Sequence, residues 1–266
     1  KERLGVYATL LVIPTFVRLL NQFGLETIIN KKIPELKVLD PSGGQARYLI
    51  QRLLAIRGAS SILFCAFIYV CSPYYMDFMG TPHLMGYRLV LILYFLIISL
   101  NSLLSTLFMT RLQYKTVSMA ETGCAFLNLA FLGLFIVLDF GIYGILYAYI
   151  IATAINILVY MWLVCGDLKG ETEAPDLKEL PSLAWASYML TLFSFGLITQ
   201  SDVMLMNYFQ VAQERIGFYH LATGLGGMLA FVMMGVGPMA FSILTETYTR
   251  DSEKGMSKIW CQIVGF

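Results

Sequence analysis

Long runs of apolar residues, separated by short polar connections, dominate the chain. A membrane-spanning helix needs about 20 mostly apolar residues to cross about 30 Å of hydrocarbon. In lipid such a run satisfies its own backbone hydrogen bonds only as a helix, so no strand is expected. The sequence therefore predicts an all-α, polytopic membrane helix bundle with seven full transmembrane helices and the start of an eighth near Ile259. The seven expected spans are Leu4–Phe23, Leu53–Cys71, Met85–Met109, Val117–Leu138, Ile142–Cys165, Leu183–Tyr208 and Ile216–Phe241.

The longest polar stretch divides these spans into two groups. Residues 166–182 carry five acidic side chains, two lysines and two prolines, a composition that is typical of a solvated linker. We expect a first helix bundle over 1–165, a cytoplasmic linker over 166–182 and the start of a second bundle over 183–266. Because the chain begins without Met and stops inside an apolar run, we interpret it as a fragment.

Lysine and arginine are unevenly distributed between the two sides of the expected membrane. When alternate connections are assigned to opposite sides, most of the 18 Lys and Arg residues lie on one side. Arg18 is left over inside the first span. Since positive residues accumulate in cytoplasmic loops, the connections after the first, third, fifth and seventh spans are expected in the cytoplasm. The protein is therefore expected to be a multi-pass protein of the cell inner membrane.

The composition excludes several classes of protein. Apolar residues make up 58% of the chain and charged residues 13%, about half the share found in soluble domains. A net charge of +1 gives no electrostatic signature of nucleic-acid binding. There is no GxxxxGK[ST] loop for ATP, and His83 and His220 have no metal-ligand spacing. We expect no cofactor, no metal and no enzymatic activity.

The first and seventh expected spans begin alike, which suggests an internal repeat. Leu4-Gly5-Val6-Tyr7 corresponds to Ile216-Gly217-Phe218-Tyr219, and the same offset places Pro14 on Gly226. Five spans lie between the copies, so both run in the same direction, as in the parallel repeats of transporters. We expect Pro14 and Gly226 to act as hinges because both residue types weaken a helix. A chance match of apolar motifs is the alternative.

Three stretches resemble a known family of membrane proteins. Gly24 is followed by Lys31-Lys32-Ile33-Pro34-Glu35, the stretch Gln200–Phe209 precedes the second Gly-aromatic-Tyr motif, and residues 238–248 end a helix with Pro, Ser and Tyr. Together they resemble the polysaccharide and oligosaccharide flippase branch of the multidrug/oligosaccharidyl-lipid/polysaccharide exporter superfamily. The family pattern often has Arg where this chain has the Lys pair.

The resemblance implies a fold and an activity. The fold would be two six-helix bundles that form an inverted V around a central cavity, of which this chain lacks the first helix and the end of the second bundle. The activity would be the transfer of a lipid-linked (polyprenyl-pyrophosphate) oligosaccharide between leaflets by alternating access, for surface polysaccharide biosynthesis. Membrane lipids and polysaccharide assembly proteins would be further partners.

Arg18 is the strongest candidate for binding such a substrate. An ionisable group inside a membrane costs about 2.5–3.5 kcal/mol on insertion scales and usually faces a wet cavity. Arginine also binds phosphate in a bidentate manner and stays protonated. We expect Arg18 to contact the phosphates of the substrate. The alternative is that its side chain extends to the cytoplasmic interface.

Three further arginines near the second span are candidates for the same chemistry. Arg52, with Arg47 and Arg57, either forms a cytoplasmic entrance for anionic head groups or anchors the chain at the membrane surface. Arg88, near the outer end of the third span, is either a cation on the release side or an interface anchor.

The remaining candidates are neutral or acidic. Asp202 would titrate, bind a cation or pair with Arg18, or else would join helices through a hydrogen bond. Asn101 would line a polar cavity or hold helices together. His220 would be either a cavity residue or, more commonly for a lone histidine, a packing residue. Glu26 and Glu121 are expected near the cytoplasmic interface.

Three functions remain open at this point. The leading hypothesis is the flippase that the resemblance implies. A drug/cation antiporter of the same superfamily would use Asp202 or Glu121 as its coupling carboxylate and would have an acidic or neutral cavity. An integral-membrane glycan polymerase or acyltransferase would need a large outer loop or a His/Asp constellation, and the expected outer loops are short.

Overall fold

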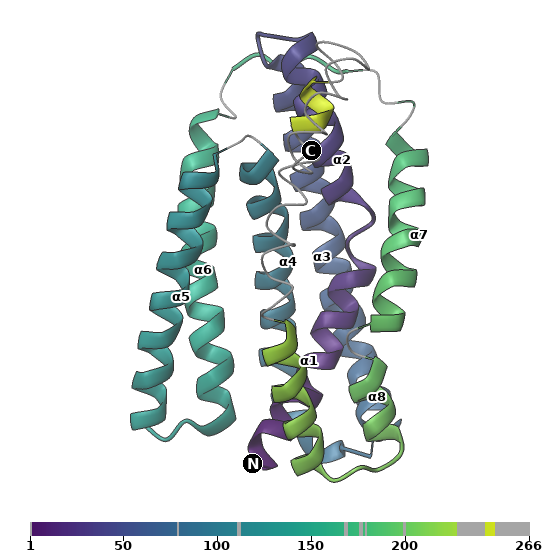
Figure 1. Cartoon of the computed structure of the whole chain (residues 1–266), viewed down its shortest axis with the longest axis vertical. Coiled ribbons are helices and arrows are strands. Elements are labelled where there is room, and N and C mark those ends of the chain that lie inside the picture. The colour runs from purple at the N-terminus through teal and green to yellow at the C-terminus, as the bar shows by residue number, and fades with distance from the viewer. Residues whose placement is uncertain are drawn as a thin grey trace, which may run out of the picture.

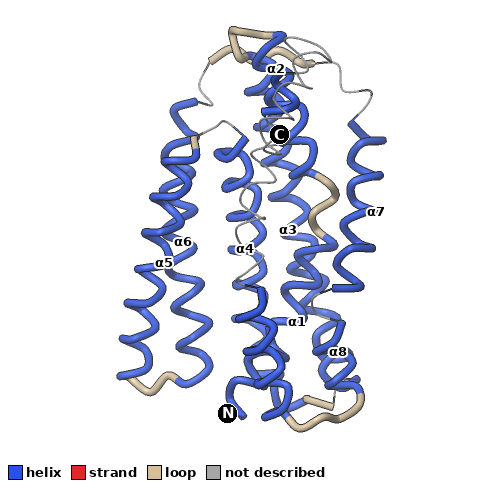
Figure 2. The backbone as a smooth tube through the Cα atoms, viewed as in Figure 1, coloured by secondary structure: helices blue, strands red, loops and turns tan. Residues whose placement is uncertain are grey.

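The computed structural model is a bundle of helices that run along its longest axis (Figure 1). It describes residues 2–78, 80–110, 113–167, 170–175, 178, 180–198, 201–227 and 243–247. Every regular element in that part of the chain is helical (Figure 2). The all-helical prediction is therefore confirmed for the described residues.

The helices follow the apolar runs of the sequence, with a short 3₁₀ turn before the fourth. They are α1 (Glu2–Leu20), α2 (Leu25–Leu39), α3 (Gly44–Phe78), the 3₁₀ helix η1 (Pro82–Tyr87), α4 (Arg88–Thr110), α5 (Tyr114–Val137), α6 (Gly141–Asp167), α7 (Leu180–Ile198) and α8 (Ser201–Tyr208). Residues 213–227 are also helical.

Seven complete spans are not seen in the described residues. Four helical segments are long and apolar enough to cross a membrane, or five if the bent pair of α1 and α2 counts as one span. The expected span Leu183–Tyr208 corresponds to α7 and α8, with residues 199–200 outside the described part. The expected span Ile216–Phe241 is described only as far as residue 227, and the expected start near Ile259 lies outside the described residues. The chain is thus a multi-pass membrane protein with at least four candidate spans.

The connections lie at the two ends of the bundle. Those after α2, α4 and α6 lie at one end, and those after α3, α5 and α8 lie at the other (Figure 1). The two groups match the alternation that the Lys and Arg distribution predicts. The α5–α6 pair forms an antiparallel hairpin at one edge of the bundle (Figure 1), and large apolar side chains of α5 such as Phe126 and Ile136 are exposed, as a lipid-facing helix requires.

The first expected span, Leu4–Phe23, corresponds to α1 and ends at a sharp bend. α1 ends at Leu20 and α2 begins at Leu25, with a bend of 45° between them. Phe23 and Gly24 both have positive φ angles, 46° and 68°, and this left-handed backbone ends a right-handed helix. An added Cβ on Gly24 would lie 2.4 Å from the carbonyl oxygen of Ala184 in α7. Glycine at this position therefore permits both the bend and the close approach of α7.

The bend separates two apolar layers of the core. Around α1, one layer includes Leu10, Phe95 of α4 and Leu146 of α6. Around α2, the other includes Ile29, Leu107 of α4 and Val164 of α6. Between the two layers, α3, α4 and α6 bury polar instead of apolar residues: Arg57, Ser61, Ser99, Thr153 and Asn156. A polar layer inside the bundle is thus level with the helix break.

The two copies of the expected repeat lie against each other. Both α1 and the helical residues 213–227 begin at the same end of the bundle (Figure 1). An added Cβ on Gly5 would lie 1.7 Å from the carbonyl oxygen of Gln213, so the glycine of the first copy allows this contact. Ala8 and Val12 of α1 form a small apolar cluster with Ile216. The division into two bundles stays a prediction.

Candidate functional site

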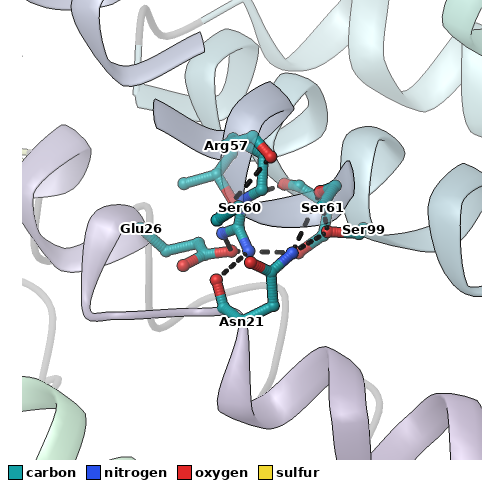
Figure 3. Close-up of polar contacts among 8 residues, drawn as sticks. Asn21, Glu26, Arg57, Ser60, Ser61 and Ser99 are labelled. Carbon is teal, nitrogen blue, oxygen red and sulfur yellow. Dashed lines mark hydrogen bonds and ion pairs between the residues drawn. The ribbon is translucent and has the colours of Figure 1, made fainter. Parts of the chain in front are cut away.

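A cluster of hydrogen-bonded side chains surrounds the break between α1 and α2 (Figure 3). Asn21, which follows the last residue of α1, is completely buried. Its side-chain nitrogen donates to the hydroxyl of Ser61 on α3 at 3.0 Å and to that of Ser99 on α4 at 2.8 Å. We call Asn21, Glu26, Arg57, Ser61 and Ser99 the break cluster. It joins the bend to the two helices behind it.

Arg57 supplies the positive charge of the break cluster. Its side chain is 0% exposed and its Nη2 donates to the carboxylate of Glu26 at 2.5 Å. Its Nη1 donates to the backbone carbonyl of Asn21 at 2.6 Å, which is one of the acceptors that a helix end leaves without a partner. Arg57 is therefore neither a cytoplasmic entrance nor a surface anchor, the two roles predicted for it. Glu26, which is expected near the cytoplasmic interface, forms an ion pair with Arg57.

Arg18 lies on α1 close to the break cluster. Its residue is half-buried, and its Nε is buried without a hydrogen-bond partner among the described residues. The Nε of Arg18 therefore lies inside the protein, and the role of Arg18 in substrate binding stays a prediction. Among the described residues of this region, Arg18 and Arg57 are the cations and Glu26 is the anion.

A second polar region follows one face of α6. Tyr149, Thr153, Asn156 and Tyr160 are spaced by four, three and four residues, which places them on one side of the helix. We call these four residues the α6 polar stripe. All four are partly or fully buried against α4 and α5.

Glu121 of α5 is the acidic group beside this stripe. Its Oε1 accepts hydrogen bonds from the hydroxyl of Tyr160 at 2.9 Å and from the amide of Asn156 at 3.3 Å. The same amide donates to Oδ1 of Asn101 on α4 at 3.2 Å. Asn101 is therefore correctly placed in a polar contact between helices, and Glu121 lies in the bundle instead of at its surface.

Two predicted arginines lie apart from these clusters. Arg52 is exposed on α3, on the other side of the helix from Arg57. The guanidinium of Arg88 stacks over the ring of Tyr69 of α3 at 4.0 Å, a cation–π contact. The contact joins the beginning of α4 to α3, and the two roles given for Arg88 stay predictions.

Asp202 and His220 contact different partners. Asp202 is exposed and accepts a hydrogen bond from the hydroxyl of Tyr219. The ring of His220 lies edge-on to that of Tyr7 on α1 at 6.3 Å. These contacts fit the hydrogen-bond and packing alternatives, and the expected pairing of Asp202 with Arg18 does not appear among the contacts of the described residues.

The two expected hinges lie in continuous helix. α1 runs through Pro14 without interruption, and its sharp bend lies about two turns later, at residues 21–24. Gly226 is exposed, and an added Cβ there would meet nothing within 4 Å. The observed bend is therefore at Gly24, where the sequence shows a glycine, and a hinge role for Pro14 and Gly226 stays a prediction.

Two cavities open near these groups. An apolar cavity of about 170 Å³ lies between α1, α3 and α8, and its walls include Ile13, Phe16 and Phe67. A second hollow, of about 280 Å³, lies at the end of the bundle where α2 meets α3, and Lys37 and Arg47 line it. The cavity between α1, α3 and α8 has apolar walls, which could contact hydrocarbon chains. The hollow between α2 and α3 is lined in part by positively charged side chains.

The comparison with protein families gives a match over nearly the whole chain. The family described as polysaccharide biosynthesis protein matches residues 1–256. The chain belongs to this family. No curated protein and no solved structure gives a match. The resemblance seen in the sequence is confirmed, and the polar clusters described above belong to a polysaccharide biosynthesis protein of the membrane.

Several residues of this family member escaped the sequence analysis. Asn21, Ser61 and Ser99 are single polar residues in apolar runs, and nothing in the sequence shows that they meet. The α6 polar stripe did leave a signal, since its spacing is helical and it interrupts a strongly apolar run. Its two tyrosines are aromatic as well as polar, which conceals the stripe in a pattern of apolar and polar positions.

Proposed function

We propose that this protein moves a lipid-linked oligosaccharide, carried on a polyprenyl pyrophosphate, from the inner to the outer leaflet of the cell inner membrane. It would do so by alternating access and without enzymatic chemistry. Membership of a polysaccharide biosynthesis family implies a lipid-linked glycan substrate in general terms. The multi-pass helical structure fits a transporter of such a substrate.

The buried and unpartnered nitrogen of Arg18 is the observation that carries this proposal. Arg57 is neutralised by Glu26, but Arg18 has a buried Nε without a partner among the described residues. A charge inside a membrane-spanning bundle is energetically costly, and the residues that carry one usually belong to a functional site. A pyrophosphate supplies the anionic oxygens that a guanidinium binds best, whereas a cation-transporting cavity would be acidic or neutral.

The helix break fits the mechanical requirement of the proposal. Alternating access needs elements that change their relative positions while their ends stay packed. α1 and α2 pack in separate apolar layers and are joined through a polar layer of hydrogen bonds. Hydrogen bonds of this kind exchange partners at less cost than an apolar core repacks.

The apolar cavity beside α1 fits the tail of the substrate. Its lining side chains include Val12, Val17 and Ile68, and it lies on the same helix as Arg18. A cavity with apolar walls holds water poorly and takes hydrocarbon. A phosphate at Arg18 would then have a place for the first part of the polyprenyl chain nearby.

Replacement of Arg18 in the full-length gene tests the proposal. We expect Arg18→Ala to abolish or strongly reduce surface polysaccharide, because a lost charge-assisted contact to phosphate reduces binding by about 1.5–3 kcal/mol. Arg18→Lys should retain part of the export, since lysine keeps the charge but not the bidentate geometry. The readout is surface polysaccharide measured with a specific lectin or antibody, at equal amounts of protein in the membrane.

Arg215→Ala is the matched control, because it removes an exposed arginine at the beginning of the helical residues 213–227. It should leave export unchanged. Normal export by Arg18→Ala would exclude Arg18 from substrate binding. Accumulation of lipid-linked oligosaccharide in the inner leaflet of the Arg18→Ala strain would separate a transport defect from a defect in sugar synthesis.

A further inference from the structure

The hollow at the end of the bundle has both apolar and positively charged walls. It has a volume of about 280 Å³ and lies where α2, α3 and the connection between α4 and α5 meet. The connections after α2, α4 and α6 lie at the same end (Figure 1), and the Lys and Arg distribution predicts that this end faces the cytoplasm. The lining includes Lys37 and Arg47, and none of its residues in the described part of the chain is acidic. The hollow is therefore suited to an anionic ligand.

Arg47 is held in place by backbone carbonyl groups and not by a carboxylate. Its Nε donates to the carbonyl oxygen of Glu171 at 3.2 Å, and its Nη2 donates to that of Ser42 at 3.1 Å. No ion pair of Arg47 with an acidic side chain is seen in the described part of the chain. The two bonds to carbonyls leave other N–H donors of the guanidinium unused. Arg47 therefore keeps an uncompensated positive charge and further donors for an anion.

The connection after α6 packs against the guanidinium of Arg47. An added Cβ on Gly170 would lie 3.2 Å from Cζ of Arg47, and the φ angle of Gly170 is 133°, a backbone conformation that favours glycine. Glycine at this position thus allows the close contact. Because the guanidinium is fixed by this contact and by two hydrogen bonds, it loses little further conformational freedom when it binds a ligand.

The carboxylate of Asp40, in the turn between α2 and α3, is occupied by that turn. It accepts hydrogen bonds from the backbone N–H groups of Ser42 and Gln45 and from the hydroxyl of Ser42. These bonds satisfy backbone donors at the beginning of α3, as a helix cap does. Asp40 is not among the residues that line the hollow, so it is not the partner of the two cations there.

The rest of the lining is mostly apolar, which narrows the class of ligand. Ile33, Ala46 and Ile50 all line the hollow and are all buried. A free inorganic anion would contact the cations and leave these apolar walls in water, whereas a phosphate bonded to an apolar group would cover them. Basic pockets between membrane helices on the cytoplasmic side bind the headgroups of anionic lipids. The mixed lining therefore favours a lipid.

We propose that this hollow binds a phosphate group, with Arg47 and Lys37 as its cationic contacts. The phosphate belongs to the headgroup of an anionic lipid in the adjacent leaflet or to a small soluble phosphate compound, and the apolar walls favour the lipid. The inference does not depend on the proposed function, because Arg18 has no part in this site. A ligand bound here contacts α2, α3 and the connection between α4 and α5 at once, and so holds these elements together at the end of the bundle.

The test measures the binding of two probes to the purified full-length protein in detergent. Native mass spectrometry measures the affinity for phosphatidylglycerol, with phosphatidylcholine, whose headgroup has no net charge, as the comparison. Equilibrium dialysis measures the binding of inorganic phosphate, alone and in competition with phosphatidylglycerol. We expect the wild type to bind phosphatidylglycerol more tightly than phosphatidylcholine. Arg47→Gln should weaken this binding about tenfold or more, because a charge-assisted hydrogen bond to phosphate is lost, and Lys37→Gln should weaken it to a smaller extent.

Arg52→Gln is the matched control, because it removes an exposed arginine of the same helix that does not line the hollow. It should bind phosphatidylglycerol like the wild type. An equal loss in Arg47→Gln and Arg52→Gln would overturn the inference, since it would show only a general attraction to the positive surface. Unchanged binding in both Arg47→Gln and Lys37→Gln would overturn it as well.

Two further outcomes separate the sources of the phosphate and protect the test against misfolding. Displacement of phosphatidylglycerol by inorganic phosphate would support a soluble phosphate compound as the ligand, and binding that inorganic phosphate does not displace would support the lipid. If Arg47→Gln does not fold, Lys37→Gln decides the test, because Lys37 is exposed at the end of α2. Export is not measured, so failure of this inference leaves the proposed function unaffected.

Discussion

The break cluster and the α6 polar stripe solve the same physical problem in different ways. Both place a glutamate inside a membrane-spanning bundle. In the break cluster Glu26 has a fully buried arginine as its partner, and a paired charge of this kind is fixed because separation would leave either ion uncompensated. Beside the stripe, Glu121 has neutral donors. The first arrangement pairs two opposite charges, and the second surrounds a carboxylate with neutral hydrogen-bond donors.

The difference shows what each region is suited to. A fixed ion pair that also binds the carbonyl of Asn21 holds the bend between α1 and α2 in a defined position. The carboxylate of Glu121 accepts hydrogen bonds from neutral groups of α6 and so joins α5 to α6. We therefore assign the positioning of the bend to the break cluster and the joining of α5 and α6 to the stripe, and the following predictions test this division.

Loss of Glu26 should have the largest effect on stability. Glu26→Ala leaves the completely buried guanidinium of Arg57 without its ion-pair partner, and removal of one partner from a buried pair costs about 3–5 kcal/mol. The measurement is thermal unfolding of the purified protein in detergent. Glu35→Ala is the comparison in the same helix and should cost less, because its partner Lys32, at 3.0 Å, keeps contact with solvent whereas Arg57 is completely buried. Equal losses for the two variants would contradict the assignment.

Asn21→Ala should have the next largest effect. It removes the two side-chain hydrogen bonds to Ser61 and Ser99, and buried polar groups that lose a partner cost about 1–3 kcal/mol. Because the hydroxyls of Ser61 and Ser99 are also 3.2 Å apart, part of the loss is recovered. Asn128→Ala on α5 is the comparison, and unfolding in detergent is again the readout. Asn21→Ala should unfold at a lower temperature than Asn128→Ala. Equal unfolding temperatures would contradict the positioning role of the break cluster.

Tyr160→Phe should destabilise the protein less than either change. It removes one hydrogen bond to Glu121, worth about 0.5–1.5 kcal/mol, and keeps the ring that stacks on Phe108 at 5.1 Å. Tyr74→Phe, at an exposed tyrosine of α3, should cause no change. A loss as large as that of Glu26→Ala would show that the stripe is also a fixed structural element.

Asp40, in the connection between α2 and α3, should contribute the least to stability among the residues compared here. The backbone N–H of Gln45 and the hydroxyl of Ser42 donate to Asp40 and hold the pKa of its carboxyl below the usual value. Its contribution is therefore complete above the ordinary pKa of about 3.9 and is lost as the pH falls through the lowered folded-state pKa. Asp40→Asn should remove a small acid-dependent part of the stability, seen by comparing unfolding temperatures at neutral and acidic pH. An unchanged pH dependence would exclude this role.

Most helices can be predicted from the sequence, but the sharp bend between α1 and α2 cannot. Expected spans such as Val117–Leu138 and Ile142–Cys165 agree with α5 and α6 within a few residues, because hydropathy is a local property and a short Asp139–Gly141 connection fixes their antiparallel pairing. The first expected span ends at Phe23, beside the observed bend, and the sequence predicts the weak point of this span at Pro14 instead. Proline was tolerated within α1, and the bend formed at Phe23 and Gly24, where contacts with α7 and the break cluster stabilise left-handed backbone.

The candidate site was predicted less well than the helices. The sequence leaves two positions open for Arg18, a cavity or the cytoplasmic interface, and the structure buries its Nε. Asp202 and His220 are both candidates for a cavity lining, and they contact Tyr219 and Tyr7 respectively. In a soluble protein, an apolar stripe shows which helix face is buried, but here lipid and protein interior are both apolar. The sequence therefore gives little information about the direction in which a polar side chain points.

Arg52 and Arg57 illustrate what can be inferred from the sequence and what requires the tertiary structure. The sequence places both at the start of the second expected span, on the side richer in positive charge. Their separation of five residues turns them about 140° apart on that helix, and only the packing of α3 against the α1–α2 break decided that Arg57 is buried and paired while Arg52 is exposed. Hydropathy specifies the spans because each run meets lipid independently. Charge pairing depends on neighbours that are distant in sequence, so it was decided by the tertiary structure.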